Sequence, residues 1–255
     1  MAVIGTNNIL KHHRLSIRIH AGGFSFIIAD ATSGEVWRRS DFSVADSENM
    51  ASVLQDALGQ VAGHSQTFES VDVIANTPST RIPLEEFRRD ELVALYRVVF
   101  PNFDLKKMDI CYTIQPQLET AEIFSIQQDV RALVTQAFPI VNFENVCGIA
   151  LERMMKHHRR TMANVGSLYA HFADNILLLC SIDGDRLVFA NTFDVPNIAD
   201  ALYFTLYTWK TLELDALKDS LYLSGHADTV AAFRDEARKY VRDIEVLDEI
   251  GMLID

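Results

Sequence analysis

The segment IHAGGFSFIIAD, residues 19–30, joins two apolar runs through a pair of glycines. The alternation of side chains around it predicts two antiparallel strands, residues 15–19 and 24–28, with a tight corner between them. A third predicted strand, residues 35–44, follows the turn-forming sequence DATSG. The segment therefore belongs to the first hairpin of a three-stranded meander.

The same order recurs in the second half of the chain. Predicted strands at residues 168–172, 176–181 and 186–195 are separated by a corner at Asp174-Asn175 and by a DGD turn at residues 183–185. Aligned pairs in the three strands are 153, 152 and 151 residues apart: Leu15 with Leu168, Phe24 with Ile176, and Phe42 with Phe193. This predicts a slip of one residue at each turn, where chain length changes most easily.

Each meander leads into a helix, a strand and a second helix. The predicted helices and strands are residues 49–61, 71–77 and about 84–99 in the first copy, and residues 198–210, 219–225 and about 227–242 in the second. A helix that joins two strands of one sheet crosses over its face, so each copy should be a mixed sheet. A last strand, about residues 243–247, can close the second copy. Few identities survive between the copies, so two unrelated α/β lobes with a similar element order remain the alternative.

Additional material separates the two copies. Two predicted strands, residues 106–115 and 120–126, and a helix, residues 127–138, form a small inserted subdomain at about residues 104–138. We therefore predict a first lobe over residues 1–143 and a second lobe over residues 144–255.

This organisation resembles the actin-like ATPase superfamily, which has a ribonuclease H-like fold. The position of the insert and the segment FPIVNFENVCGIALERMM, residues 138–155, are most similar to the bacterial cell-division and pilus-assembly actin homologues. The chain as a whole is similar to an uncharacterised bacterial family, domain of unknown function 3822. The resemblance implies an α/β, duplicated actin-like fold with two mixed-sheet lobes and flanking helices.

The resemblance also implies where a nucleotide would bind. In the superfamily each meander corner carries an Asp followed two residues later by a Gly, and these corners hold phosphate and magnesium. Here the first corner is His20-Ala21-Gly22-Gly23, in which a histidine replaces the carboxylate. A neutral imidazole is a poor ligand for a hard cation that prefers oxygen. The second corner, Asp174-Asn175 before an apolar strand, suits a hairpin turn better than a phosphate loop.

The third superfamily motif, a strand that ends in glycines beside the adenosine, is partly present in LSGHADTVAAFRDEARK at residues 223–239. Ser224 and Gly225 match it, and His226 stands in place of the second glycine. A side chain at this position would obstruct the close approach that glycine allows.

These departures predict a degenerate actin-like protein that has lost ATP hydrolysis, with no catalytic residue, no metal and no required cofactor. Its expected role is that of a binding or scaffolding module for a protein partner or a second copy of itself. The alternative is a nucleotide-binding protein or small-molecule kinase with a rearranged interdomain cleft. The residues expected to line that cleft are His20, Gly22, Gly23, Asp174, Asn175, Ser224, Gly225 and His226.

Composition narrows the range of partners. The net charge is -12, from 35 acidic and 23 basic residues, which disfavours a nucleic-acid partner. The longest clean apolar run, Ile176 to Cys180, is too short to span a bilayer, and the N-terminus lacks the apolar core of a signal peptide. We therefore predict a cytoplasmic protein without a membrane partner.

Three further groups of residues are candidates for function. The three cysteines lack paired spacing, and the adjacent pairs His12-His13 and His157-His158 point in different directions on a helix, so neither group predicts a metal site. The helix at residues 198–209 is apolar on nearly every side. It is either buried or a docking surface whose aromatic residues are Tyr203, Phe204, Tyr207 and Trp209.

Overall fold

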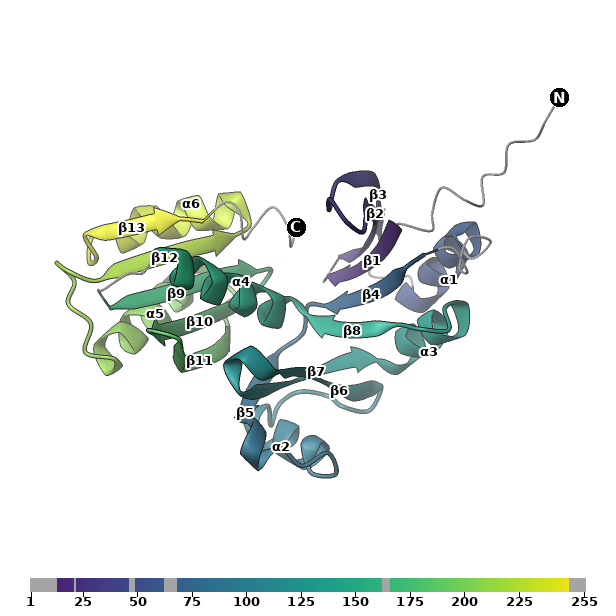
Figure 1. The fold of residues 1–255 in the computed structure, drawn as a ribbon, viewed down its shortest axis with the longest axis horizontal. Coiled ribbons are helices and arrows are strands. Elements are labelled where there is room, and N and C mark those ends of the chain that lie inside the picture. The colour runs from purple at the N-terminus through teal and green to yellow at the C-terminus, as the bar shows by residue number, and fades with distance from the viewer. Residues whose placement is uncertain (1–12, 21, 46–48, 62–67, 162–165, 248–255) are drawn as a thin grey trace. The chain divides into compact units, whose positions relative to one another are not determined.

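The structure, a computed structural model, describes residues 13–20, 22–45, 49–61, 68–161 and 166–247. The described residues fall into two compact units (Figure 1). The units take their residues from these segments: Met1–Asn76, Pro101–Tyr112 and Ser125–Glu144 in the first, and Thr77–Phe100, Thr113–Phe124 and Asn145–Asp255 in the second. The predicted lobe boundary at residues 143 and 144 stays a prediction.

The first five-stranded sheet begins with the meander that the sequence predicts. Its elements are β1 (His13–His20), β2 (Gly23–Asp30), β3 (Val36–Ser43), α1 (Met50–Val61), β4 (Ser70–Ala75) and β8 (Asn142–Asn145). The strand order is β3-β2-β1-β4-β8. β1 pairs antiparallel with β2 and parallel with β4, as expected for a mixed sheet. The buried side chains of its core include Leu15, Ile17, Phe24 and Leu54.

The second five-stranded sheet repeats this topology. Its elements are β9 (Ser167–Ala173), β10 (Ile176–Asp183), β11 (Arg186–Asp194), α5 (Ile198–Thr211), β12 (Ser220–Gly225), α6 (Ala227–Ala237) and β13 (Asp243–Val246). The order is β11-β10-β9-β12-β13, and β9 is antiparallel to β10 and parallel to β12. The two sheets therefore have the same order, and the three meander strands and the strand parallel to the first of them run in the same directions in both, which confirms the duplicated architecture.

The registers locate the difference in length between the copies. Leu15 pairs with Ile28, and Leu168 pairs with Ser181, so both strands of the first hairpin keep an offset of 153 residues. The expected one-residue slip at the first corner is wrong, because His20 pairs with Gly23 and Ala173 pairs with Ile176, again 153 residues apart. The whole difference falls at the next turn, between β2 and β3 in one copy and between β10 and β11 in the other.

In the chain, the insert comes after β4 and before β8, which are neighbours in the first sheet. Its elements are β5 (Ser79–Pro83), the 3-10 turn η4 (Leu84–Glu86), α2 (Leu92–Val99), β6 (Met108–Gln115), the 3-10 turn η5 (Pro116–Leu118), β7 (Thr120–Gln127) and α3 (Gln128–Ala137). The strands form a three-stranded sheet of order β5-β7-β6, in which β5 and β7 are antiparallel.

The insert corrects one element assignment from the sequence. The continuous helix expected over residues 84–99 is wrong, because Phe87 has an extended backbone and α2 begins only at Leu92. α3, and not the helix at residues 84–99, is the counterpart of α6. α3 packs against α1 as α6 packs against α5, and each leads to the last strand of its sheet.

Helices cover both faces of the second sheet. On one face, Leu168, Ala170 and Phe172 of β9 belong to the core formed with α5 and α6. Alternate residues of a strand face opposite ways, and Tyr169 on the other face contacts His158 of α4 (Val146–Thr161). This double coverage explains why β10 is an almost continuous apolar run.

α5 is buried along one side and exposed along the other. Trp209 is buried, and Phe204 packs partly buried against the same core. Tyr203 and Tyr207 are 63% and 61% exposed, and their rings stack with centroids 6.2 Å apart. The four aromatic residues of this helix are therefore divided between the core and the surface.

Candidate functional site

The corner of the second sheet is a tight turn between β9 and β10. Ala173 pairs with Ile176, so Asp174 and Asn175 alone connect the strands. Asp174 has a φ of 49°, in the left-handed region that a short polar residue tolerates. The backbone N–H of Val195 donates to the carbonyl oxygen of Asn175 at 2.7 Å. The turn is thus bonded to the residue that follows β11, the strand paired with β10.

The end of β12 lies beside this corner. Gly225 pairs with Phe172 and has a φ of +113°, and a Cβ there would lie 2.1 Å from the Phe172 carbonyl oxygen. Only glycine allows this approach. His226 follows as the N-cap residue of α6, and its Nε2 lies 3.6 Å from Oδ1 of Asp174. The second unit therefore gathers five of the residues expected at the site: Asp174, Asn175, Ser224, Gly225 and His226.

His171 is the residue of this corner that the sequence interpretation missed. It is 1% exposed, and its Nδ1 lies 3.0 Å from the Ser224 hydroxyl. Burial, with smaller contributions from Arg153 and His226, lowers the pKa of His171 to about 3, so the ring is neutral at pH 7. Its Nε2 is also buried and makes no hydrogen bond within the described residues. The available signal was a lone histidine inside an otherwise apolar strand.

The corner of the first sheet contains the other three candidates, His20, Gly22 and Gly23, and belongs to the other compact unit. Gly23 has a φ of +149°, and a Cβ there would lie 2.0 Å from the carbonyl oxygen of Phe42. A Cβ on Gly22 would meet nothing within 4 Å. Of the two adjacent glycines, Gly23 is therefore the one that the packing of β2 against β3 requires.

The residues at these corners are a poor set of ligands for magnesium. Magnesium prefers several oxygen ligands in octahedral geometry. The carboxylate of Asp174 faces His226, and the first corner has a histidine, His20, where the resemblance expects a carboxylate. Across the described residues, no group of three or more His, Cys, Asp and Glu side chains could hold a metal ion.

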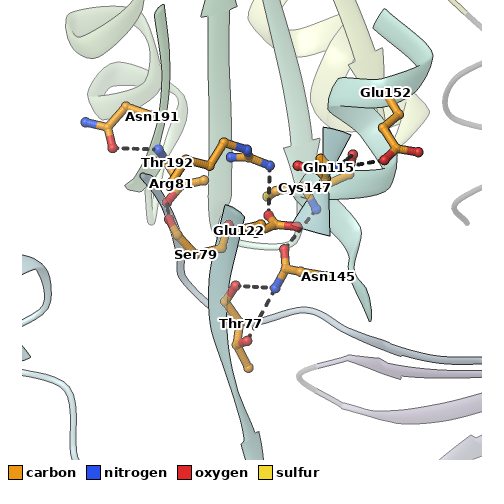
Figure 2. Close-up of polar contacts among 11 residues, drawn as sticks. Thr77, Ser79, Arg81, Gln115, Glu122, Asn145, Cys147, Glu152, Asn191 and Thr192 are labelled. Atoms are coloured by element: carbon orange, nitrogen blue, oxygen red, sulfur yellow. Dashed lines mark hydrogen bonds and ion pairs between the residues drawn. The ribbon is translucent and has the colours of Figure 1, made fainter. Parts of the chain in front are cut away.

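A second polar cluster, buried in the same unit as the second sheet, was not anticipated (Figure 2). Arg81 of β5 contacts Glu122 of β7 at 2.8 Å, with side chains only 5% and 1% exposed. Burial is the largest influence on Glu122 and raises the pKa of its carboxyl, against the opposing effect of Arg81. An ion pair so deeply buried depends on both partners, since either one alone would be an uncompensated charge.

The first turn of α4 fits around this ion pair. A Cβ on Gly148 would lie 1.8 Å from a carboxylate oxygen of Glu122, so glycine provides the space that Glu122 occupies. Asn145 accepts a hydrogen bond from the backbone N–H of Cys147 at 2.9 Å and donates to the carbonyl of Thr77 at 2.9 Å. Asn145 thereby caps the helix and fastens it to the chain entering β5.

Gln115 and Thr192 extend the cluster to neighbouring elements. The Gln115 side-chain amide donates to the Gly148 carbonyl at 3.2 Å and to Glu152 at 3.0 Å. The hydroxyl of Thr192 in β11 donates to the carbonyl of Ser79 in β5 at 2.6 Å (Figure 2). The cluster therefore joins the inserted strands, α4 and the edge of the second sheet.

The three cysteines and one of the paired histidines, His158, are buried. All three cysteines are buried and form no disulfide, and burial raises the pKa values of Cys147 and Cys180 to about 12. His158 packs with its Nδ1 3.2 Å from the Tyr169 hydroxyl, and burial lowers its pKa. His12 lies outside the described residues. None of the three cysteines is therefore an accessible nucleophile.

A family model described as "Protein of unknown function (DUF3822)" matches residues 5–244. The chain belongs to this family. None of the curated proteins matches it.

Solved structures connect the DUF3822 family to the actin-like fold. A Bacteroides thetaiotaomicron protein with an actin-like ATPase fold and unknown function is 21% identical, with a TM-score of 0.82 over 94% of this chain and 93% of that one. A chain of the PilM–PilN type IV pilus biogenesis complex is 11% identical, with a TM-score of 0.50 over 93% and 89%. The ethanolamine utilization protein EutJ from Carboxydothermus hydrogenoformans is 7% identical, with a TM-score of 0.47 over 95% and 87%. The first likeness establishes the fold predicted from the sequence.

Within the part of the DUF3822 chain that the structure describes, no helix is both long enough and apolar enough to cross a membrane. The expectation of a cytoplasmic location stays a prediction.

Proposed function

We propose that this DUF3822 protein is a degenerate actin-like module that binds or scaffolds other proteins and does not hydrolyse ATP. The observation that carries the proposal is the pairing of Asp174 with His226 at 3.6 Å across the second corner. The carboxylate that would serve magnesium in an active relative is a left-handed turn residue directed at an imidazole.

The chemistry of phosphoryl transfer explains why this matters. Catalysis there depends on positioning and on neutralising charge at the phosphates, with magnesium and oriented donors in place. The first corner offers His20 instead of a carboxylate, and the second offers one carboxylate beside His226. Gly23 and Gly225 are each explained by close backbone contacts within their own sheets. We infer that the fold persists as a scaffold without the catalytic groups.

The alternative function is nucleotide binding without efficient hydrolysis, or phosphorylation of a small molecule. It is favoured by Gly225, which keeps a positive φ at the end of β12, where the resemblance places the adenosine. Ser224 beside it is held by His171. In this alternative, the residues that would contact the nucleotide are the eight corner residues predicted from the sequence.

Thermal unfolding with and without ATP and magnesium separates the two functions. A ligand at 100 times its dissociation constant should stabilise a protein by about 2.7 kcal/mol. We expect no shift with ATP or ADP up to millimolar concentration and no phosphate release. A saturable shift would contradict the proposal and favour the alternative.

A restored variant makes this test sharper. Replacing His20 with Asp and His226 with Gly returns a carboxylate and a glycine to the positions where the resemblance expects them. If these two replacements account for the loss of nucleotide binding, ATP should raise the unfolding temperature of His20→Asp/His226→Gly more than that of the wild type. The matched control is His157→Asp, which alters a histidine outside both corners and should give no shift.

The scaffolding role requires assembly, and light scattering together with capture experiments tests it directly. We expect a protein partner or a second copy, and we expect no nucleic acid, because the net charge of -12 repels phosphate backbones. A protein that is monomeric at every concentration and captures no partner would contradict the proposal.

A further inference from the structure

The outermost strand of the first sheet, β3, presents an exposed edge. β3 is the outermost strand in the order β3-β2-β1-β4-β8, and most of its residues are exposed. Val36 and Trp37 are 57% and 58% exposed. An edge strand carries backbone N–H and C=O groups that can pair with another chain.

The register with β2 determines which backbone groups of β3 point outward. The backbone N–H of Val44 donates to the Gly22 carbonyl at 2.9 Å, in continuation of the β2–β3 ladder. Hydrogen-bonded and non-hydrogen-bonded pairs alternate in an antiparallel ladder. The backbone groups of Arg39, Asp41 and Ser43 therefore point away from β2, toward the edge of the sheet.

The corresponding edge of the second sheet, strand β11, is covered by another strand. The outermost strand β11 contacts β5, and the Thr192 hydroxyl donates to the Ser79 carbonyl at 2.6 Å. In the first sheet, the order of the described strands places nothing on the outer side of β3.

Charges along β3 identify a complementary occupant. Arg39 Nε lies 3.0 Å from Oδ1 of Asp41, and the two side chains are 47% and 60% exposed. Asp41 is fixed further by the Ser25 hydroxyl, which donates to Oδ1 at 2.7 Å. One positive and one negative side chain thus lie two residues apart, on the same face and at outward-pointing positions.

We propose that β3 pairs antiparallel with β3 of a second copy of this chain, with Ser40 on the two-fold axis. When two antiparallel edge strands are related by a two-fold axis perpendicular to the sheet, both copies present the same face on the same side. Alternate residues of a strand share a face, so odd-numbered residues then lie opposite odd-numbered residues, and even-numbered residues opposite even-numbered ones. With Ser40 on the axis, Arg39 of each copy lies opposite Asp41 of the other. The hydrogen-bonded positions are then those whose backbone groups point outward. The inference deepens the proposed scaffolding function, on which it rests, by naming the partner.

Neighbouring registers are disfavoured by the same charges. An axis through Arg39 would place two arginines opposite each other, and an axis through Asp41 would place two carboxylates opposite each other. Like charges directly opposite destabilise a strand pair, whereas opposite charges stabilise it. The spacing of Arg39 and Asp41 therefore selects a single register around Ser40.

Complementary charge-reversal variants test this pairing. Arg39→Asp gives a strand with two carboxylates, Asp41→Arg gives a strand with two cations, and each should dissociate because like charges then oppose each other twice. We expect each single variant to weaken self-association by about tenfold or more. An equal mixture of the two variants should recover the dimer, as should the double variant Arg39→Asp/Asp41→Arg. Arg186→Asp, at the start of edge strand β11, is the matched control and should leave association unchanged.

Light scattering for mass and circular dichroism for folding provide the measurements. Recovery of the dimer in the mixture would show that the single variants still fold. A monomeric wild type would overturn the inference and leave the charges on β3 as a protection of the edge against pairing. A wild-type dimer unaffected by either variant would also overturn it, since the interface would then lie elsewhere. In that last case the inference about β3 fails, but the scaffolding proposal stands. The scaffolding proposal would instead be refuted if the protein bound and hydrolysed a nucleotide, whether or not it forms a dimer.

Discussion

The two sheets share a topology and differ in their surroundings. Each has a meander followed by a parallel strand and a closing strand, in the same order. The second sheet is covered on both faces, and every residue of β9 is buried. In β1 of the first sheet only Leu15 and Ile17 are fully buried. Strand order and register therefore persisted through the duplication, whereas burial and polarity diverged.

Equivalent positions show how far the chemistry diverged. The registers align Arg18 with His171, and Ala75 with Gly225. The positive-φ glycine of the first sheet, Gly23, aligns with Ile176 in the second. Each copy thus has a glycine where an added Cβ would collide with the backbone of a neighbouring strand. The close backbone contacts at Gly23 and Gly225 are sufficient to require glycine at both positions.

The largest expected effect is at Gly225, whose counterpart in the first sheet is an alanine. Gly225→Ala would force a Cβ to within 2.1 Å of the Phe172 carbonyl at a φ of +113°. We expect a loss of about 3 kcal/mol or more in the free energy of unfolding. Gly22→Ala, with nothing within 4 Å, is the control and should change stability by no more than about 0.5 kcal/mol. Urea denaturation of both variants measures the contrast, and equal stabilities would refute the geometry of the β9–β12 end.

The next effect is at the ion pair beside the second sheet. Arg81→Met removes the partner of a carboxylate that is 1% exposed and should cost about 3 kcal/mol at neutral pH. Without Arg81 the pKa of Glu122 should rise further, so the folded state binds a proton that the unfolded state releases. Stability of the variant should therefore fall as pH rises from the unfolded carboxyl pKa through the raised one.

The control for this prediction is Arg81→Met/Glu122→Leu, which removes both charges and should recover most of the loss. Urea denaturation across pH measures both variants. If Arg81→Met lost the same stability at every pH, Glu122 would not be the group left uncompensated.

The fold could be predicted from the sequence, but the buried cluster around Arg81 and Glu122 could not, for a physical reason. Alternating apolar residues and turn-forming corners determine strands locally, which is why both meanders could be predicted. Arg81 and Glu122 are 41 residues apart, and charged residues are ordinarily exposed. Only the pairing of β5 with β7 brings them together. The prediction of a helix over residues 84–99 was also wrong. The apolar pattern continues through Phe87, but the backbone there is extended.

The corner residues were predicted only in part. Asp174, Gly225 and His226 were selected from the resemblance, and the registers place them together. His171 was missed because a polar residue in a strand carries no local sign of its partner. Its bond to Ser224 arises from the parallel pairing of β9 with β12, which joins residues 53 positions apart.

His171 should give the second sheet a dependence on pH that Arg18 cannot give the first. Its pKa is lowered to about 3 in the folded state, so below the unfolded value near 6.5 only the unfolded state takes up the proton. Stability is then lost as pH falls below 6.5, by about 2 kcal/mol between pH 7 and pH 5. His171→Gln should remove this part of the acid sensitivity, whereas Ser224→Ala, which keeps the imidazole, should retain it. Equal pH slopes for the wild type and His171→Gln in urea titrations would contradict the assignment.

The smallest effect concerns the edge strand that the insert covers. Thr192→Val keeps the shape of the side chain and removes the 2.6 Å hydrogen bond to the Ser79 carbonyl, leaving that buried acceptor without its hydroxyl partner. The expected cost is about 1 kcal/mol, as for a typical hydrogen bond. Thr211→Val removes an exposed hydroxyl bond to a helix carbonyl and should cost less, because water replaces it. Hydrogen exchange of the β11 amides should also quicken in Thr192→Val if β5 protects this edge. An unchanged exchange rate would mean that β11 is as open as β3, and the contrast between the two edges would disappear.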